Sequence, residues 1–263
     1  MRESAGLSLQ SRREEGTLRT VLIISLLIVS VASAATMSPP AIEWERLYFP
    51  GYWSRFNCIT ETGDGGYAAA ITVSVSANTA NSFYRLSATG DILWAARSDL
   101  DNQGGQVVKE LQNGDFIVAG FGRELPSSSI ALMIGKYSST GQEIWTKLYN
   151  SPYTGSEIAL SFDLLPDGGF AICGDIDPAE GMNQAWILRT DSQGDTLWTR
   201  EWGWIKWDRA RGILCIDNVI TVLCSGRLEG DPGGTYIVRY SLSGDLLSEY
   251  RIPEMQGRYG FGM

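Results

Sequence analysis

Histidine is missing from the sequence, and cysteine is scarce. Without an imidazole, the chain cannot use Ser-His-Asp or Cys-His catalysis, and zinc sites with a histidine ligand are excluded as well. We expect the cysteines to be small buried residues of strands, although an exported chain could also form disulfides. The four cysteines form no CxxC pair and no closely spaced framework. They are Cys58, Cys173, Cys215 and Cys224.

Positive charge is in the minority, because 30 acidic residues face 21 basic ones and the net charge is −9 at pH 7. Such a chain repels nucleic acid and anionic membrane surfaces, so nucleic acid is excluded as a main partner. Apolar residues make up 44% of the chain, which suits a globular protein with a hydrophobic core. The 30 glycines suit many short strands joined by tight turns.

Residues 1–34 have the features of a secretory signal peptide. Arginines at 12, 13 and 19 precede an apolar run from Val21 to Val31, and Ala32-Ser33-Ala34 is a small-x-small cleavage site. A membrane anchor is the alternative, but the run is shorter than the ~20 residues that span a bilayer. We therefore expect cleavage of 1–34 and a secreted chain that does not span the membrane. It would lie outside the cell or on its outer surface, with the periplasm as the alternative.

An internal repeat dominates the rest of the sequence. A glycine is followed four residues later by tryptophan at intervals of about 50 residues, and at the last repeat serine replaces the tryptophan. Trp44 fits the same register, with Pro40 where the glycine would stand. We expect these positions to be structural markers of the repeat. They are Gly90 with Trp94, Gly141 with Trp145, Gly194 with Trp198, and Gly244 with Ser248.

A second marker with the same period predicts four strands in each repeat. Hairpin turns that need positive φ occur at 64–65, 113–114, 167–168 and 217–218, each followed by an aromatic or apolar residue. Four antiparallel strands per period of about 50 residues are typical of a propeller blade. The sequence thus predicts an all-β propeller at 35–263. Its expected blades are 53–98, 104–149, 156–202 and 209–251, with a leading outer strand at 42–49.

The leading strand raises the question of ring closure. An extra outer strand needs three inner strands, which the last blade normally supplies, but the last repeat already has its own outer strand. We therefore expect a C-terminally truncated ring of five to eight blades. Closure of four blades with one spare strand is the alternative.

The repeats resemble a known class of propeller. Residues 88–94, 139–145 and 191–198 resemble the tryptophan-docking motif of PQQ-type propellers, in which the outer-strand tryptophan packs between blades. Residues 186–198 also resemble repeats of large secreted bacterial proteins that often end in a type IX secretion sorting domain. The resemblance covers 42–252 and implies architecture rather than activity. Pro40, Ser248 and Val219 depart from the pattern.

Aromatic and arginine residues gather in the loops that join one blade to the next. Exposed aromatic rings beside arginine bind sugar rings or protein partners, so these loops are the candidate ligand site. The alternative is that the rings fill the seams between blades. The candidate residues are Tyr52, Trp53, Arg55, Trp202, Trp204, Trp207 and Arg209.

The loops between second and third strands should share that face, and they are acidic. Oxygen ligands of this kind suit Ca²⁺, but their spacing matches no fixed calcium loop, and such residues more often cap their own turns. We expect no cofactor and no metal, with Ca²⁺ as the alternative. The acidic residues are Asp175, Asp177, Glu180, Glu229 and Asp231.

No catalytic constellation is recognisable in the sequence. We therefore expect a secreted or surface-displayed, non-enzymatic interaction scaffold that binds an extracellular protein or glycan on its aromatic loop face. One alternative is a propeller enzyme, either a hydrolase or a quinoprotein. Another is a structural spacer of a larger surface protein. A fold alone cannot choose among these functions.

Overall fold

A computed structural model gives the structure of much of the chain. The predicted signal peptide, Tyr52, Trp204 and Trp207 lie outside the described residues, and the side chain of Trp53 is also not described. The chain divides into the units Met1–Glu45 and Arg46–Met263, and the blades belong to the second. The described residues are 43–48, 53–74, 82–100, 102–124, 127, 129–153, 155–177, 183–203, 208–226 and 233–253.

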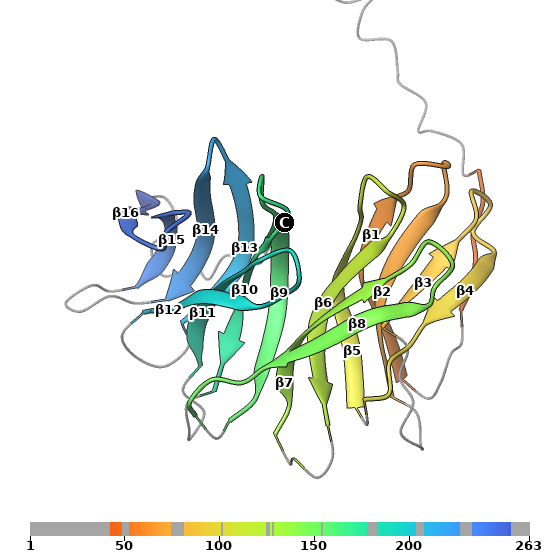
Figure 1. The fold of residues 1–263 in the computed structure, drawn as a ribbon, viewed down its shortest axis with the longest axis horizontal. Helices are drawn as coiled ribbons and strands as arrows, with labels where there is room; N and C mark the ends of the chain where they lie inside the picture. The colour runs from red at the N-terminus through yellow and green to blue at the C-terminus, as the bar shows by residue number, and fades with distance from the viewer. Residues whose placement is uncertain are drawn as a thin grey trace, which may run out of the picture. The chain divides into compact units, whose positions relative to one another are not determined.

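The second unit is an all-β propeller fold with four blades of four antiparallel strands in the described part of the chain (Figure 1). The first two blades are β1 (Trp53–Glu61), β2 (Tyr67–Ser74), β3 (Phe83–Leu86) and β4 (Ile92–Ala96), then β5 (Asn102–Glu110), β6 (Phe116–Arg123), β7 (Ala131–Tyr137) and β8 (Glu143–Tyr149). The third blade is β9 (Glu157–Leu164), β10 (Phe170–Ile176), β11 (Gln184–Thr190) and β12 (Thr196–Trp202). The fourth is β13 (Arg209–Ile216), β14 (Val219–Gly226), β15 (Gly234–Ser241) and β16 (Leu246–Arg251).

The first two blades also touch edge to edge. Thr72 of β2 pairs with Gly104 of β5, which links these blades into one sheet of eight strands. Glycine makes this approach feasible, since a Cβ at Gly105 would lie 2.0 Å from the carbonyl oxygen of Ser82. The third and fourth blades remain separate four-stranded sheets.

The hydrophobic core lies in the seams between successive blades. One cluster joins the first and second blades around Phe83 and Phe116, and a second joins the second and third blades around Ile134 and Ile172. A third joins the third and fourth blades and includes Cys173 and Cys224, both buried as free thiols. The sheets of the second and third blades therefore have a neighbouring blade on each face, which explains their continuous apolar strands.

The Gly-x-x-x-Trp markers form the contacts between outer strands and the next blade. A Cβ at Gly141 would lie 2.7 Å from the ring of Trp94, and one at Gly244 would lie 2.9 Å from the ring of Trp198. Trp198 Nε1 also donates to the carbonyl of Leu242 at 3.0 Å. Each of these glycines has positive φ, so turn geometry and close packing both favour glycine.

The expected leading outer strand at 42–49 is wrong for the residues that are described. Residues 43–48 carry no strand, because none of the described strands pairs with them. Tyr48 nevertheless takes the docking role of Tyr149. The hydroxyl of Tyr48 donates to the Gly90 carbonyl at 2.5 Å, and that of Tyr149 donates to the Gly194 carbonyl at 2.7 Å.

Within the described residues, no helix is long and apolar enough to span a membrane.

Candidate functional site

A cleft of about 400 Å³ lies where the first strands of the blades come together. The strands β1, β5, β9 and β13 all contribute to its lining, and the end of β10 adds two carboxylates. Charged and amide side chains dominate this lining. Its residues are Arg55, Gln106, Ser156, Ile158, Leu160, Asp175, Ile176, Asp177, Asn183, Arg209 and Arg211.

A β-bulge at the same place in every first strand shapes this cleft. The bulges leave one residue without a partner across the ladder, namely Asn57 in β1, Gln106 in β5, Leu160 in β9 and Arg211 in β13. Three of these four residues line the cleft. Bulges redirect side chains and are frequent beside binding sites, so the second, third and fourth blades each present one bulge side chain to the cleft.

The bulge residue of the first blade ties two strands together instead. Asn57 Nδ2 donates to the carbonyl of Gly105 at 2.6 Å and to Thr72 Oγ1 at 2.8 Å. Arg55 Nε in turn donates to Asn57 Oδ1 at 2.6 Å. These hydrogen bonds hold β1 against β2 and β5 at the edge of the cleft.

Asp175 is the most perturbed carboxyl group of the cleft. It is 9% exposed, and its Oδ2 lies 3.4 Å from Arg209 Nη1 across the seam between the third and fourth blades. Its Oδ1 is buried and has no hydrogen-bond partner. Burial raises the pKa of Asp175 to about 6, and the opposing charges of Arg209 and Arg211 limit that rise.

Arg211 carries an unsatisfied hydrogen-bond donor in the same cleft. Its Nε is buried without a hydrogen-bond partner, although Asp175 is close enough to act on its charge. Desolvation lowers the pKa of the Arg211 guanidinium, and Asp175 partly offsets this effect. A buried donor and a buried acceptor are therefore both left unsatisfied in one cleft, each at a cost in free energy.

Asp177 adds a second carboxylate to the same wall. Its backbone N–H donates to the carbonyl of Ser156 at 3.1 Å, while its Oδ1 is buried without a partner. Gly155 accommodates this segment, since a Cβ there would lie 1.6 Å from the Asp177 carbonyl oxygen. Asp175 and Asp177 both line the cleft and are two positions apart at the end of β10, a spacing that separates Cα atoms by about 6.6 Å in extended backbone.

Glu157 is a third buried carboxylate nearby, but it does not line the cleft. It is paired with Ile176 and is 1% exposed. Its Oε1 accepts a hydrogen bond from Ser151 Oγ at 2.6 Å, and burial raises its pKa. Because its neighbours on β10 alternate between faces, we assign it to the opposite side of the sheet from Asp175.

The predicted aromatic platform is wrong at Trp202. This side chain is only 4% exposed, its ring centroid lies 5.0 Å from that of Tyr236, and its Nε1 donates to Glu249 Oε1 at 2.6 Å. The alternative prediction is confirmed for Trp202, because its ring fills the seam between the third and fourth blades. Arg55 and Arg209 do line the cleft, whereas Tyr52, Trp204, Trp207 and the side chain of Trp53 lie outside the description.

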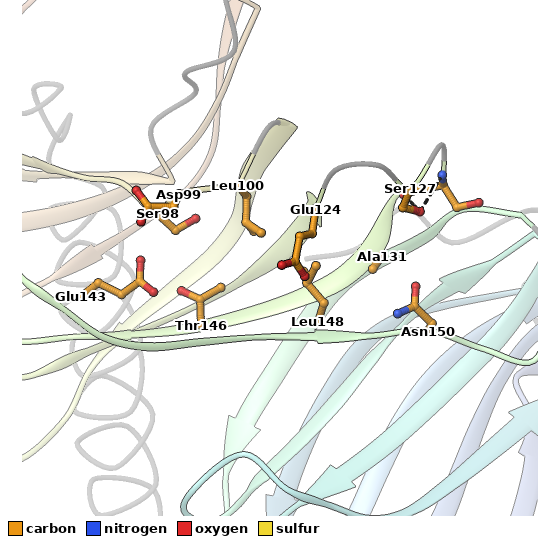
Figure 2. A pocket seen from close by; sticks show the side chains of 11 residues that line it. Ser98, Asp99, Leu100, Glu124, Ser127, Ala131, Glu143, Thr146, Leu148 and Asn150 are labelled. Carbon is orange, nitrogen blue, oxygen red and sulfur yellow. Dashed lines mark hydrogen bonds between the residues drawn. The ribbon is translucent and has the colours of Figure 1, made fainter.

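A larger groove of about 700 Å³ runs along β8 (Figure 2). Asp99, Glu124 and Glu143 give the groove an acidic character. Figure 2 shows Glu143 on β8 together with Thr146 and Leu148, and Asp99 and Glu124 above that strand. All three carboxylates belong to exposed residues. Water satisfies such groups, so this groove lacks the desolvated charges that distinguish the cleft around Asp175.

In the described ranges, no group of three or more Cys, Asp or Glu residues is placed to hold a metal ion. The carboxylate of Asp175 faces Arg209 instead. The prediction that left Ca²⁺ as an alternative also included Glu180, Glu229 and Asp231, which are outside the described residues.

Sequence reasoning placed both loop classes on one face but missed their pairing. Arg55 and Arg209 were assigned to an aromatic platform and Asp175 and Asp177 to an acidic loop, whereas the structure brings all four into one cleft. Gln106 was missed because nothing in a single repeat marks a bulge. An alignment of the first strands of the four repeats would have placed Gln106 and Arg211 at the same position.

Comparison with known proteins finds similarity in fold only. No family model matches the chain, and no curated protein does. A solved structure of a eukaryotic initiation factor is 11% identical at a TM-score of 0.45, and the match covers 80% of this chain and 45% of that one. A thermostable family-43 glycoside hydrolase is 11% identical at a TM-score of 0.44, covering 76% and 73%. A family-43 enzyme from Bacillus licheniformis is 10% identical at 0.44, covering 76% and 43%.

These neighbours correct the functional expectation. The chain spans less than half the length of the initiation factor and of the Bacillus licheniformis enzyme. The glycoside hydrolases among them correspond to the alternative, a propeller enzyme, and not to the expected non-enzymatic interaction scaffold. Identity of 10–11% concerns the fold, so any reaction must be argued from the residues of the cleft.

Proposed function

We propose that this protein is a propeller hydrolase that cleaves glycosidic bonds, with the cleft around Asp175 as its active site. The observation that carries the proposal is the set of unsatisfied groups: Oδ1 of Asp175, Oδ1 of Asp177 and Nε of Arg211 are all buried without partners. Such groups cost free energy unless water or a ligand satisfies them.

A sugar is the ligand that fits this mixture best. Each sugar hydroxyl both donates and accepts, so neighbouring hydroxyls can give hydrogen bonds to the aspartates and take one from Arg211. A phosphate group only accepts, so it could not give a hydrogen bond to either aspartate. Gln106, Ser156 and Asn183 line the same cleft and offer further groups that donate and accept.

The two carboxylates supply the chemistry that glycoside hydrolysis needs. Asp175, whose pKa burial raises to about 6, carries a proton in a useful fraction of molecules near that pH and protonates the leaving oxygen. Asp177 acts as the base that removes a proton from the attacking water. An acid on one side of the scissile bond and a water-activating base on the other are the two groups that inverting enzymes use.

The proposal extends to architecture and location. The blades belong to the tryptophan-docked class that PQQ-type propellers represent, which the packing of Trp94 on Gly141 supports. The signal sequence predicted at 1–34 supports export, so the substrate is an extracellular polysaccharide.

A substrate panel tests this function. The purified chain is incubated with a range of polysaccharides and aryl glycosides, and new reducing ends are counted. We expect turnover in the wild type and a loss of at least ~100-fold in Asp175→Asn, because general acid catalysis contributes about 10²–10⁴-fold. Asp195→Asn, at an exposed turn, is the matched control and should keep full turnover. Equal turnover in Asp175→Asn and wild type would refute the assignment.

A further inference from the structure

The charge of the cleft is opposite to that of the chain. The chain carries −9, yet the charged residues that line the cleft are three arginines and two aspartates. Because lysine is absent from this lining, its positive charge comes entirely from planar guanidinium groups. Guanidinium forks match the two oxygens of a carboxylate, which a lysine ammonium does not.

The three arginines are in different states of pairing. Arg209 lies 3.4 Å from Asp175, and Arg55 donates to Asn57. Arg211 is the bulge residue of β13, and its Nε is buried without a partner. A partly buried guanidinium with an unsatisfied donor is stabilised strongly when an anion binds beside it.

We propose that the cleft is specific for acidic sugars and that Arg211 pairs with the carboxylate of a uronic acid residue. This inference rests on the proposed glycoside hydrolase and names its substrate class. The hydroxyls of the same residue satisfy Asp175 and Asp177, so one sugar ring serves both kinds of unsatisfied group. Arg211 is then a residue that determines specificity, and the proton transfer stays with the aspartates.

Paired ligands give a direct test. Oligosaccharides of galacturonic, glucuronic and mannuronic acid are each compared with their methyl esters, which keep the sugar and remove the charge. Binding is measured by calorimetry in Asp175→Asn, which the proposed mechanism makes inactive. We expect at least one acid to bind about 10- to 100-fold more tightly than its ester, the range for a hydrogen bond between charged groups.

Substitutions then identify the residue. Arg211→Gln should abolish the preference for the acid, and Arg211→Lys should keep only part of it because the fork is lost. Arg239→Gln, at an exposed position of β15, removes the same charge outside the cleft and should change nothing. Thermal melting of each variant verifies that it is folded, and Arg211→Lys keeps the test valid if Arg211→Gln unfolds.

Several results would overturn the inference. Equal binding of every acid and its ester would do so, as would a preference that survives in folded Arg211→Gln. Binding of inorganic phosphate without binding of any oligosaccharide would show a general anion site. Hydrolysis of neutral polysaccharides with no acidic preference would leave the proposed function standing and refute this inference. Arg211-dependent binding of acidic sugars without turnover in the wild type would support the acidic-sugar site and refute the proposed hydrolase function.

Discussion

The carboxylate of Asp175 and the guanidinium of Arg209 lie 3.4 Å apart across the seam between the third and fourth blades. Neither residue's own blade contains the other, so the pair exists only because the blades stack. Burial raises the pKa of Asp175 to about 6 despite the attraction of Arg209. The site therefore depends on the packing of two repeats.

The first prediction concerns pH and stability. The pKa of Asp175 is raised from 3.8 to about 6 on folding, so its stabilising contribution is complete below pH 3.8 and lost as the pH rises through 6. By linkage, two pKa units correspond to about 3 kcal/mol. Urea unfolding at pH 4 and pH 7 should show wild type losing about that much relative to Asp175→Asn. A difference that stays constant with pH would contradict it.

The second prediction concerns Arg209. Its positive charge lowers the pKa of Asp175, so Arg209→Gln should raise that pKa further and move the alkaline limb of activity to higher pH. Arg239→Gln is the control for loss of an exposed charge. An unchanged pH profile in folded Arg209→Gln would show that the two groups are not coupled.

The third prediction separates turn strain from blade docking. Gly65 and Gly141 both have positive φ, but a Cβ at Gly65 meets no atom within 4 Å, whereas one at Gly141 would lie 2.7 Å from Trp94. Gly65→Ala should cost about 1–2 kcal/mol from strain alone. Gly141→Ala should cost about 1–3 kcal/mol more through overpacking. Equal losses in urea unfolding would argue against docking.

The fourth prediction concerns Trp202. Because it is buried in the third seam, Trp202→Ala should lower the free energy of unfolding by about 3–5 kcal/mol. Trp202→Phe should keep much of the stability while losing the hydrogen bond to Glu249. If folded Trp202→Phe lost sugar binding but kept its stability, the ring would be part of a ligand site after all.

The fifth prediction concerns stereochemistry. If Asp175 acts as the acid and Asp177 as the base that activates water, the sugar released should have the inverted configuration. Proton NMR during hydrolysis identifies the first anomer to appear. Release of the retained anomer would rule out the assigned role of Asp177 as a base for water.

Local patterns predicted the fold because each is read within one repeat. Turn glycines such as Gly141 need positive φ, and Trp94 recurs four residues after its own turn glycine. The blades follow from these patterns. The cleft does not, since Asp175 and Arg211 lie in different repeats and meet only when sheets stack. Bulges such as that at Arg211 leave no mark in a single strand.

The expected aromatic platform failed for a related reason. Trp202 occupies the last position of an outer strand, where a ring can face either a loop or the next blade. The contact of its ring with Tyr236 of the fourth blade shows that the ring lies in the seam between the blades. Residue type alone could not make that choice.

The most direct test of the account is the pH dependence of kcat/KM for the best polysaccharide of the panel, in wild type and Asp175→Asn. A general acid must be protonated to act, so activity should fall about tenfold per pH unit above the pKa of Asp175, about 6. Asp175→Asn should show almost no turnover at any pH. A wild-type rate that does not fall above pH 6, or an Asp175→Asn variant as active as wild type, would contradict the account.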